Sequence, residues 1–248
     1  MVDDAQGNGS SKIGLRAGLF LIFAFSGVAG LIYEAVWGRY LKLFLGHSAY
    51  AQTFVIAIFM GGMALGAGVT SKLSRRWSSL LRAYAYTELL IGVIAFTFHD
   101  LFQGATSWAF VSVIPSLESA FLISSFKHLL ALSLILGPAI LLGMTFPLMS
   151  GGVIRLFPHL SGSSLSMLYF TNSLGAACGV LLTGFVFVPT AGLPGTVLIA
   201  GFLNVVIGLV VLLMARGIKE PPIVEHVVEG DVYLKVRKCY ITTRTIHI

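Results

Sequence analysis

Two carboxylates within long apolar segments are the residues whose types and positions could do chemistry. Glu34 lies near the end of the first apolar segment, and Glu88 lies six residues after Arg82. An ionisable side chain in hydrocarbon is costly, so it needs a partner, a water-filled cavity or a neutral state. Glu34 is therefore the leading candidate for a proton or cation site.

A second interpretation makes Glu34 a structural anchor. Its carboxylate would pair with Arg39 or Lys42, or accept a hydroxyl from a neighbouring helix. It would then lie just below an aromatic belt at the membrane surface. That belt would consist of Tyr33, Trp37 and Tyr40.

The other intramembrane polar residues are weaker candidates. Glu88 stands about 9 Å of helical rise from Arg82, so it is expected to snorkel or to meet that arginine. Asn172 and Asn204 are expected to tie helices together through their amides, a contribution of about 1 kcal/mol or less.

Helix breakers and small residues give the remaining signals. Pro138 and Pro147 interrupt the fourth apolar segment, where such breaks either line a cavity or kink the helix for packing. Glycines about one turn apart predict close helix packing and not a phosphate loop. No metal-ligand spacing, catalytic triad or cofactor motif is readable, so no catalytic residue, metal or cofactor is expected.

Composition places these residues in a membrane. Of the 248 residues, 56% are hydrophobic and only 10% are charged, against about a quarter charged in soluble domains. Apolar runs repeatedly reach the roughly 20 residues that cross hydrocarbon. The predicted fold is an all-α integral membrane domain of about six spans. These are 14–37, 49–71, 82–98, 127–150, 164–188 and 194–215.

The distribution of basic residues predicts the topology. Lys and Arg concentrate in connections on one side, which indicates a cytoplasmic N-terminus and C-terminus in a bacterial inner membrane. The broken apolar stretch 105–122 contains Pro115 and Glu118 and is expected to form an interfacial helix. Were it a seventh span, the basic residues after it would face outward, so six spans are favoured.

A faint internal repeat accompanies this pattern. Residues 41–44 match 154–157, residues 65–67 match 174–176, and residues 88–92 match 204–208, in the same order. Because each unit holds three spans, the second must cross in the opposite sense. This predicts a 3+3 inverted-topology repeat of the kind found in secondary transporters, unless the similarity is chance among Leu/Gly-rich helices.

Three regions follow from these patterns. Residues 1–12 are polar and expected to be disordered, 13–217 form the transmembrane domain, and 218–248 form a short cytoplasmic tail with one or two strands. The net charge of +6 comes from short basic clusters between apolar runs, so nucleic acid is not an expected partner.

Several of these positions together resemble a known family. Residues 26–34 with Trp37 and Arg39, residues 59–66, and a later set from Leu168 to Gly192 are similar to the membrane portion of the bacterial fused major-facilitator-like spermidine synthase proteins. That family usually adds a cytoplasmic aminopropyltransferase domain. About thirty residues follow Arg216 here, too few for that domain. The resemblance therefore implies no transferase residue in this sequence.

Three functions remain open from the sequence. The chain is a carrier for a small, polyamine-like cation or the membrane partner of a separate cytoplasmic synthase. Alternatively it is a non-transporting anchor whose tail recruits an enzyme. An enzyme acting alone is the least supported, because no catalytic constellation is present. Expected partners are the lipid bilayer, the synthase and a second copy of the chain in a homo-oligomer.

Overall fold

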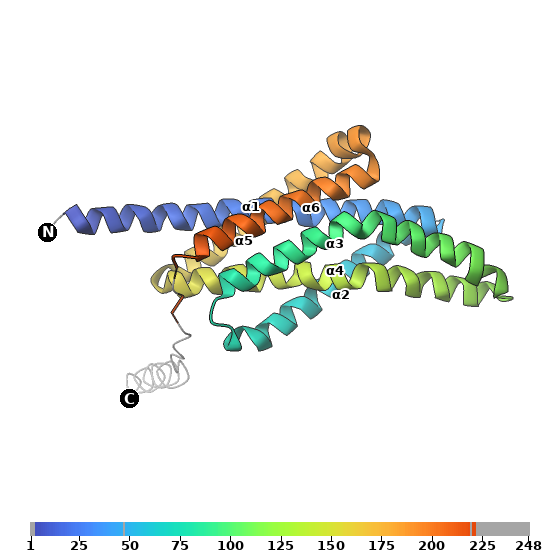
Figure 1. The fold of residues 1–248 in the computed structure, drawn as a ribbon, viewed down its shortest axis with the longest axis horizontal. Helices are drawn as coiled ribbons and strands as arrows, with labels where there is room; N and C mark the ends of the chain where they lie inside the picture. The colour runs from blue at the N-terminus through green and yellow to red at the C-terminus, as the bar shows by residue number, and fades with distance from the viewer. Residues whose placement is uncertain (1–2, 47, 219, 222–248) are drawn as a thin grey trace, which may run out of the picture.

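The chain forms a bundle of long helices. The computed structural model describes residues 3–46, 48–218 and 220–221. In this part of the chain the α-helices are α1 (Asp3–Leu45), α2 (Ser48–Leu73), α3 (Leu80–Trp108), α4 (Ala120–Leu156), α5 (Ser161–Leu182) and α6 (Val188–Ala215), with no strand (Figure 1). The predicted all-helical class is confirmed. The α1 helix extends into the segment 1–12 for which disorder was predicted, and the strands predicted for the tail lie outside the described residues.

Five helical stretches are long and apolar enough to cross a membrane. They are Ile13–Leu45, Ala49–Leu73, Leu80–Ser116, Ala120–Leu156 and Pro158–Ala215. Several apolar helices of this length indicate a membrane-embedded protein.

The fifth stretch contains two helices, α5 and α6, that run in opposite directions. Gly192 has φ 66° and ψ −175°, which is not helical, and Pro194 follows it. A positive φ is readily adopted only by glycine, so the chain reverses direction at this residue. Figure 1 shows the resulting hairpin of α5 and α6.

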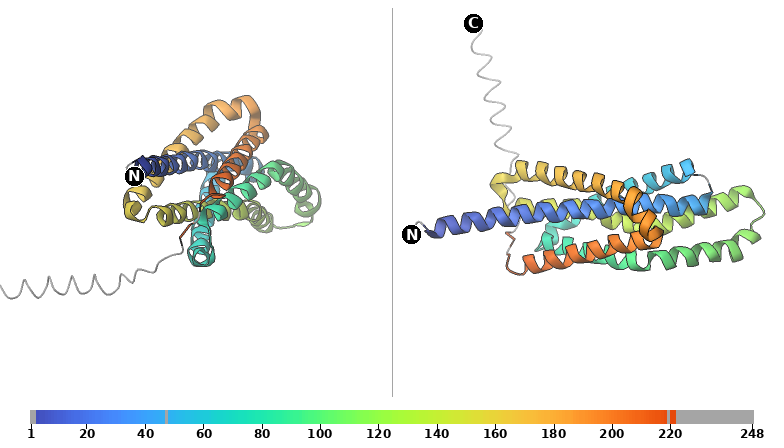
Figure 2. Two further views of the ribbon diagram at one scale, coloured as in Figure 1. Left: turned by 60° about the vertical axis from the view of Figure 1, so that its left-hand side comes forward. Right: turned by 90° about the horizontal axis from the view of Figure 1, so that it is seen from above.

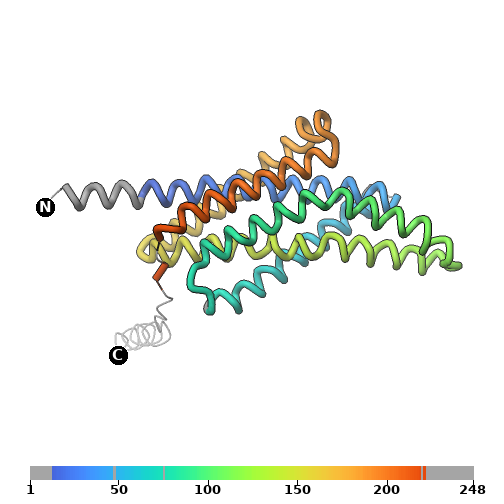
Figure 3. Tube along the Cα trace, in the orientation of Figure 1, coloured from blue at the N-terminus to red at the C-terminus, as the bar shows by residue number. Residues whose placement is uncertain are grey.

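The prediction of a separate helix over 105–122 is wrong. Residues up to Trp108 belong to α3, which continues through a π-helical turn (Ala109–Val113) and a 3-10 turn (Ile114–Ser116). Helix α4 begins directly afterwards at Ala120. Gly104 lies between the predicted third span and residue 105, but no proline stands before Pro115, so the helical backbone continues up to it. Figure 3 shows the long α3–α4 hairpin that results.

Three helix pairs make the most extensive contacts, namely α1 with α5, α2 with α4, and α3 with α6. Figure 2 shows this elongated arrangement from two further directions. Glycines allow each close approach. A Cβ at Gly175 would clash with the carbonyl of Ala24, and one at Gly66 would clash with that of Ile140. The predicted glycine seams therefore lie where helix backbones meet.

The aromatic residues of α1 are core residues and not a surface belt. Tyr33, Trp37 and Tyr40 are 1%, 2% and 4% exposed. Tyr33 stacks on Trp37, with ring centroids 5.5 Å apart, and both Trp37 and Tyr40 contact Phe98 of α3. The prediction of an aromatic belt is wrong because these rings point toward α3 within the protein.

Candidate functional site

Glu34 lines a cavity of about 560 Å³ formed by α1, α2, α4 and α5. The α1 residues in its wall recur every three or four positions, which places them on one helix face. They are Phe23, Ser26, Gly27, Gly30, Leu31 and Glu34. Two of them are glycines, so this face of α1 leaves room beside the carboxylate.

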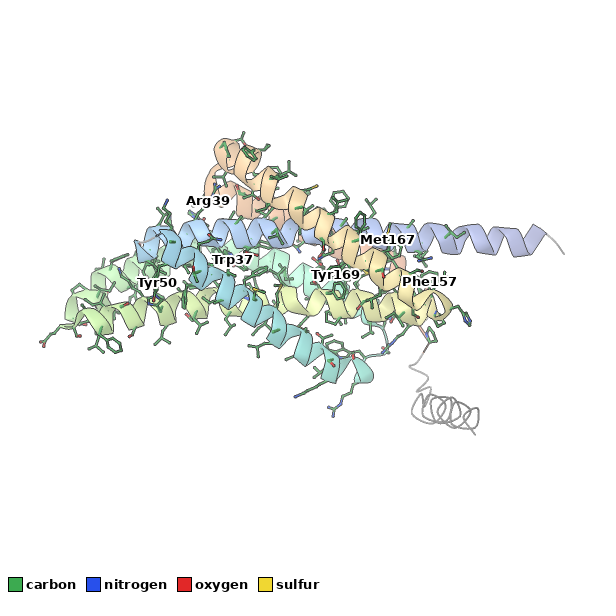
Figure 4. The ribbon with its side chains drawn as sticks, turned by 180° about the vertical axis from the view of Figure 1, so that it is seen from behind. Trp37, Arg39, Tyr50, Phe157, Met167 and Tyr169 are labelled. Atoms are coloured by element: carbon green, nitrogen blue, oxygen red, sulfur yellow. The ribbon has the colours of Figure 1, made fainter. Side chains whose placement is uncertain are left out.

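The other three helices supply aromatic, hydroxyl and amide groups. The principal ones are Phe59 and Met63 of α2, Thr145, Phe146 and Pro147 of α4, and Tyr169, Asn172 and Ser173 of α5. Figure 4 shows α2 and α5 on the near side of α1 and α4, with Tyr169 between α5 and α4. The Tyr169 and Phe146 rings meet edge to face, with centroids 6.1 Å apart.

The Glu34 carboxylate has no ionic partner among the described side chains. The structure shows neither a hydrogen bond nor an ion pair from Glu34 to Arg39 or Lys42 in this part of the chain. Five residues along a helix rotate a side chain by about 140° relative to the first, so Arg39 points away from Glu34. The predicted ion pair is therefore wrong, and a half-buried carboxyl group faces the cavity.

Glu88 lies outside this cavity and is more deeply buried than Glu34. Its side chain is 0% exposed, and its two carboxylate oxygens each accept a hydrogen bond. Ser26 Oγ of α1 donates to Oε1 over 2.6 Å, and Asn204 Nδ2 of α6 donates to Oε2. The carboxylate thus joins three helices in the centre of the bundle.

The hydrogen bonds continue from Asn204 to Tyr33. The Tyr33 hydroxyl donates to Asn204 Oδ1 over 2.8 Å. Tyr84, four residues before Glu88, buries its hydroxyl beside the same carboxylate without a hydrogen bond of acceptable geometry. The hydrogen bonds of this network thus run between helices, from α1 and α6 to α3 and from α1 to α6.

Glu88 does not snorkel toward Arg82. The Arg82 guanidinium donates instead to the carbonyl of Ala215 over 3.4 Å. Residues 82 and 88 are separated by six positions, which places their side chains about 120° apart around the helix axis. Asn204 lies within hydrogen-bonding distance of Glu88 instead. That earlier expectation is therefore wrong, and the contact of Asn204 could not be read from spacing along α3.

Ser26 contacts both the Glu34 cavity and Glu88, and it was not identified from the sequence as a candidate site residue. It lines the Glu34 cavity and donates to Glu88. The available signal was its position eight residues before Glu34, which puts both side chains near one helix face.

The other candidates, Asn172, Pro147 and Pro138, do not all lie at the same cavity. Asn172 and Pro147 line the Glu34 cavity. Pro138 instead borders a much smaller space beside Tyr33 and Trp37. Helix α4 continues through both prolines, so neither breaks it into two helices.

A second polar cluster ties the segment after α6 to the start of α3. The Glu220 carboxylate accepts the Ser79 hydroxyl over 2.5 Å and the backbone N–H groups of Leu80 and Leu81 over 2.7 and 2.9 Å. Arg155 of α4 lies 3.7 Å from the same carboxylate. Glu220 therefore satisfies N–H groups that a helix start leaves unpaired.

Within the described residues, no group of three His, Cys, Asp or Glu side chains is arranged to hold a metal ion. The site offers the Glu34 carboxylate, which has no partner among the described side chains and faces a cavity, and the Glu88 carboxylate, which is buried in a hydrogen-bonded network.

Comparison with known proteins gives one relationship. The chain is 26% identical over 203 residues to a polyamine aminopropyltransferase of Oceanobacillus iheyensis, an alignment that covers 82% of this chain and 36% of the relative. The chain thus spans about a third of the relative's length. This similarity supports a spermidine synthase-like relationship. No family model matches the chain. No solved structure matches it either.

Proposed function

We propose that this chain is a carrier-like membrane domain that binds a small organic cation of the polyamine type in the Glu34 cavity. The observation that carries the proposal is the half-buried carboxylate of Glu34, which faces a cavity of about 560 Å³ with no cationic partner among the described residues. A carboxylate in such a place is stabilised by a cation that enters the cavity. The similarity to a polyamine aminopropyltransferase favours a polyamine.

The rest of the cavity wall suits an aliphatic amine. Aromatic rings attract ammonium groups and also pack against methylene groups, and hydroxyl and amide oxygens accept N–H bonds. The rings are Phe23, Phe59, Phe146 and Tyr169, and the polar groups are Ser26, Thr145, Asn172 and Ser173.

A 3+3 inverted repeat with six spans is part of the proposal. Helix contacts support it, because exchanging α1 with α4, α2 with α5, and α3 with α6 converts the α1–α5 pair into the α2–α4 pair and the reverse, and returns α3–α6 to itself. In this scheme α5 and α6 cross the bilayer separately. The N-terminus and the end of α6 then lie on the cytoplasmic side of an inner membrane, with Arg16, Arg82 and Arg155.

Individual glycine contacts support the same exchange. A shift of 116 residues relates Ala24 to Ile140, and a shift of 109 residues relates Gly66 to Gly175. Gly175 meets the Ala24 carbonyl just as Gly66 meets the Ile140 carbonyl. For α1 and α4 this register differs by three residues from the shift of 113 in the sequence match.

The cavity would then lie on the axis that relates the two halves. The same shifts relate Gly27 to Gly143 and Met63 to Asn172, and all four residues line the cavity. Secondary transporters built from inverted repeats bind their substrates at such an interface near the middle of the membrane. This placement favours a carrier over a passive anchor.

The test is uptake of radiolabelled spermidine by proteoliposomes that contain the parent or Glu34→Gln. The parent is expected to exceed protein-free liposomes, and Glu34→Gln to lose at least about tenfold in uptake. Glu118→Gln is the matched control, since Glu118 is exposed at the turn between α3 and α4. Equal uptake by the parent and Glu34→Gln would remove Glu34 from the mechanism, and uptake by the parent no faster than leak would remove the carrier function.

The second candidate function is a membrane anchor or assembly scaffold for a polyamine synthase. Two observations favour it. First, this chain is similar to 36% of a longer protein that is named as an aminopropyltransferase. Second, Glu220 binds the segment after α6 to the start of α3. Deleting 221–248 should then abolish copurification of the enzyme while the bundle stays folded. An unchanged copurifying set would contradict a role for the tail.

A further inference from the structure

Glu88 is a buried acidic group that the proposed cation site does not use, although Ser26 connects the two. We propose that Glu88 exchanges a proton for the cation in the Glu34 cavity, so that proton and cation binding exclude each other. This inference rests on the proposed cation site and adds to it a second, proton-binding site.

The hydrogen bonds around Glu88 can serve both forms of its carboxyl group. Asn204 can only donate to Glu88 through Nδ2, because its Oδ1 accepts the Tyr33 hydroxyl. The Ser26 hydroxyl is different, since it can rotate and either donate or accept. It donates to Glu88 Oε1 in the structure, and by rotating it can accept from a protonated carboxyl group instead.

No cation among the described residues faces Glu88. On α3 itself the titratable neighbour is Tyr84, and on α1 Tyr33 reaches it through Asn204. Helix α6 contributes no ionisable side chain. The ionisable residues of α4 stand near its two ends, and they are Lys127, His128 and Arg155. A negative charge on Glu88 is therefore uncompensated unless a proton or an external cation is nearby.

The Glu34 cavity is where that external cation would come from. Ser26 is 5% exposed and forms part of the cavity wall, so a single side chain separates the cavity from the Glu88 carboxylate. A cation in the cavity favours ionised Glu88 through this thin and poorly screened barrier. Protonated Glu88 in turn weakens cation binding, because coupling between two sites is reciprocal.

The experiment measures proton release when spermidine is added to the purified full chain in weakly buffered detergent solution. The parent is expected to release about one proton per bound spermidine, and its affinity is expected to rise by up to about tenfold per pH unit over the titration range. Glu88→Gln should still bind spermidine, but without proton release and without this pH dependence. Equal proton release by Glu88→Gln, or spermidine binding to the parent without proton release, would overturn the inference.

A second variant covers the case in which Glu88→Gln does not fold. Ser26→Ala keeps both carboxylates and removes the hydroxyl between them, so the midpoint of the pH-dependent binding should shift. An unmoved midpoint overturns the coupling through Ser26. Failure of the parent to bind spermidine at any pH removes the proposed cation site itself, which distinguishes that failure from the failure of proton exchange.

Discussion

Glu88 of α3 accepts a hydrogen bond from Asn204 of α6, its counterpart 116 residues later in the chain. Both residues are 0% exposed, and the glycines four residues after each of them meet the opposite helix. Gly92 approaches the Gly201 carbonyl, and Gly208 approaches the Ala85 carbonyl. The contacts that α3 makes with α6 are thus nearly equivalent to those that α6 makes with α3.

The Glu88–Asn204 contact makes a prediction about stability. Asn204→Ala leaves Glu88 short of one donor and the Tyr33 hydroxyl without its acceptor, at a cost of about 1–3 kcal/mol. Thermal unfolding in detergent would show this as a lowered midpoint. The control is Asn172→Ala, because Asn172 lies half-buried in the cavity wall and makes no side-chain hydrogen bond to a described residue. Equal losses in the two variants would contradict this assignment.

The equivalent glycines of α2 and α5 predict paired effects. Gly66→Ala and Gly175→Ala place a methyl group against a backbone carbonyl, so each is expected to destabilise the fold by about 1–3 kcal/mol. Gly61→Ala and Gly68→Ala of α2 place it in open space, where alanine improves helix propensity by up to about 1 kcal/mol. Equilibrium unfolding of the four variants tests this. Opposite outcomes at Gly66 and Gly175 would argue against their equivalence.

Tyr169 predicts an aromatic contribution to cation binding. Tyr169→Leu should weaken spermidine binding by about two- to fivefold, which corresponds to an exposed cation–π contact, whereas Tyr169→Phe should bind like the parent. Isothermal titration of the purified variants measures this. Tyr86→Leu is the control, since Tyr86 is comparably exposed at 61% but lies outside the cavity wall. A loss in Tyr169→Phe as large as that in Tyr169→Leu would show that the hydroxyl matters and the ring does not.

Glu220 predicts local protection at the start of α3. Glu220→Ala removes the acceptor of the Leu80 and Leu81 N–H groups and the ionic partner of Arg155, so these amides should exchange with deuterium faster. The loss of helix capping is expected to cost about 0.5–2 kcal/mol. Hydrogen exchange resolved to α3 peptides tests this, with Glu118→Ala as control. Unchanged exchange at Leu80 and Leu81 would contradict the capping role.

The sequence alone determined the solvent and the class of the protein. Long apolar runs cannot be exposed to water, and a backbone in hydrocarbon must satisfy its polar groups within helices, so an all-helical membrane domain follows from composition and run length. The same reasoning identified Glu34 and Glu88 as costly, because an isolated charge in hydrocarbon is unfavourable in any fold. The glycine seams were readable for a similar reason, since small residues at helical spacing permit close packing wherever a partner lies.

Only the tertiary structure decided which partners these residues meet. Spacing along one helix suggested Arg39 for Glu34 and Arg82 for Glu88, but the angle around the helix turns both arginines away. The true partners of Glu88 are Ser26 and Asn204, which lie 62 and 116 residues away in the chain. Hydrogen bonds between helices depend on how the helices cross, and that crossing is set by packing over the whole bundle and not by any local pattern.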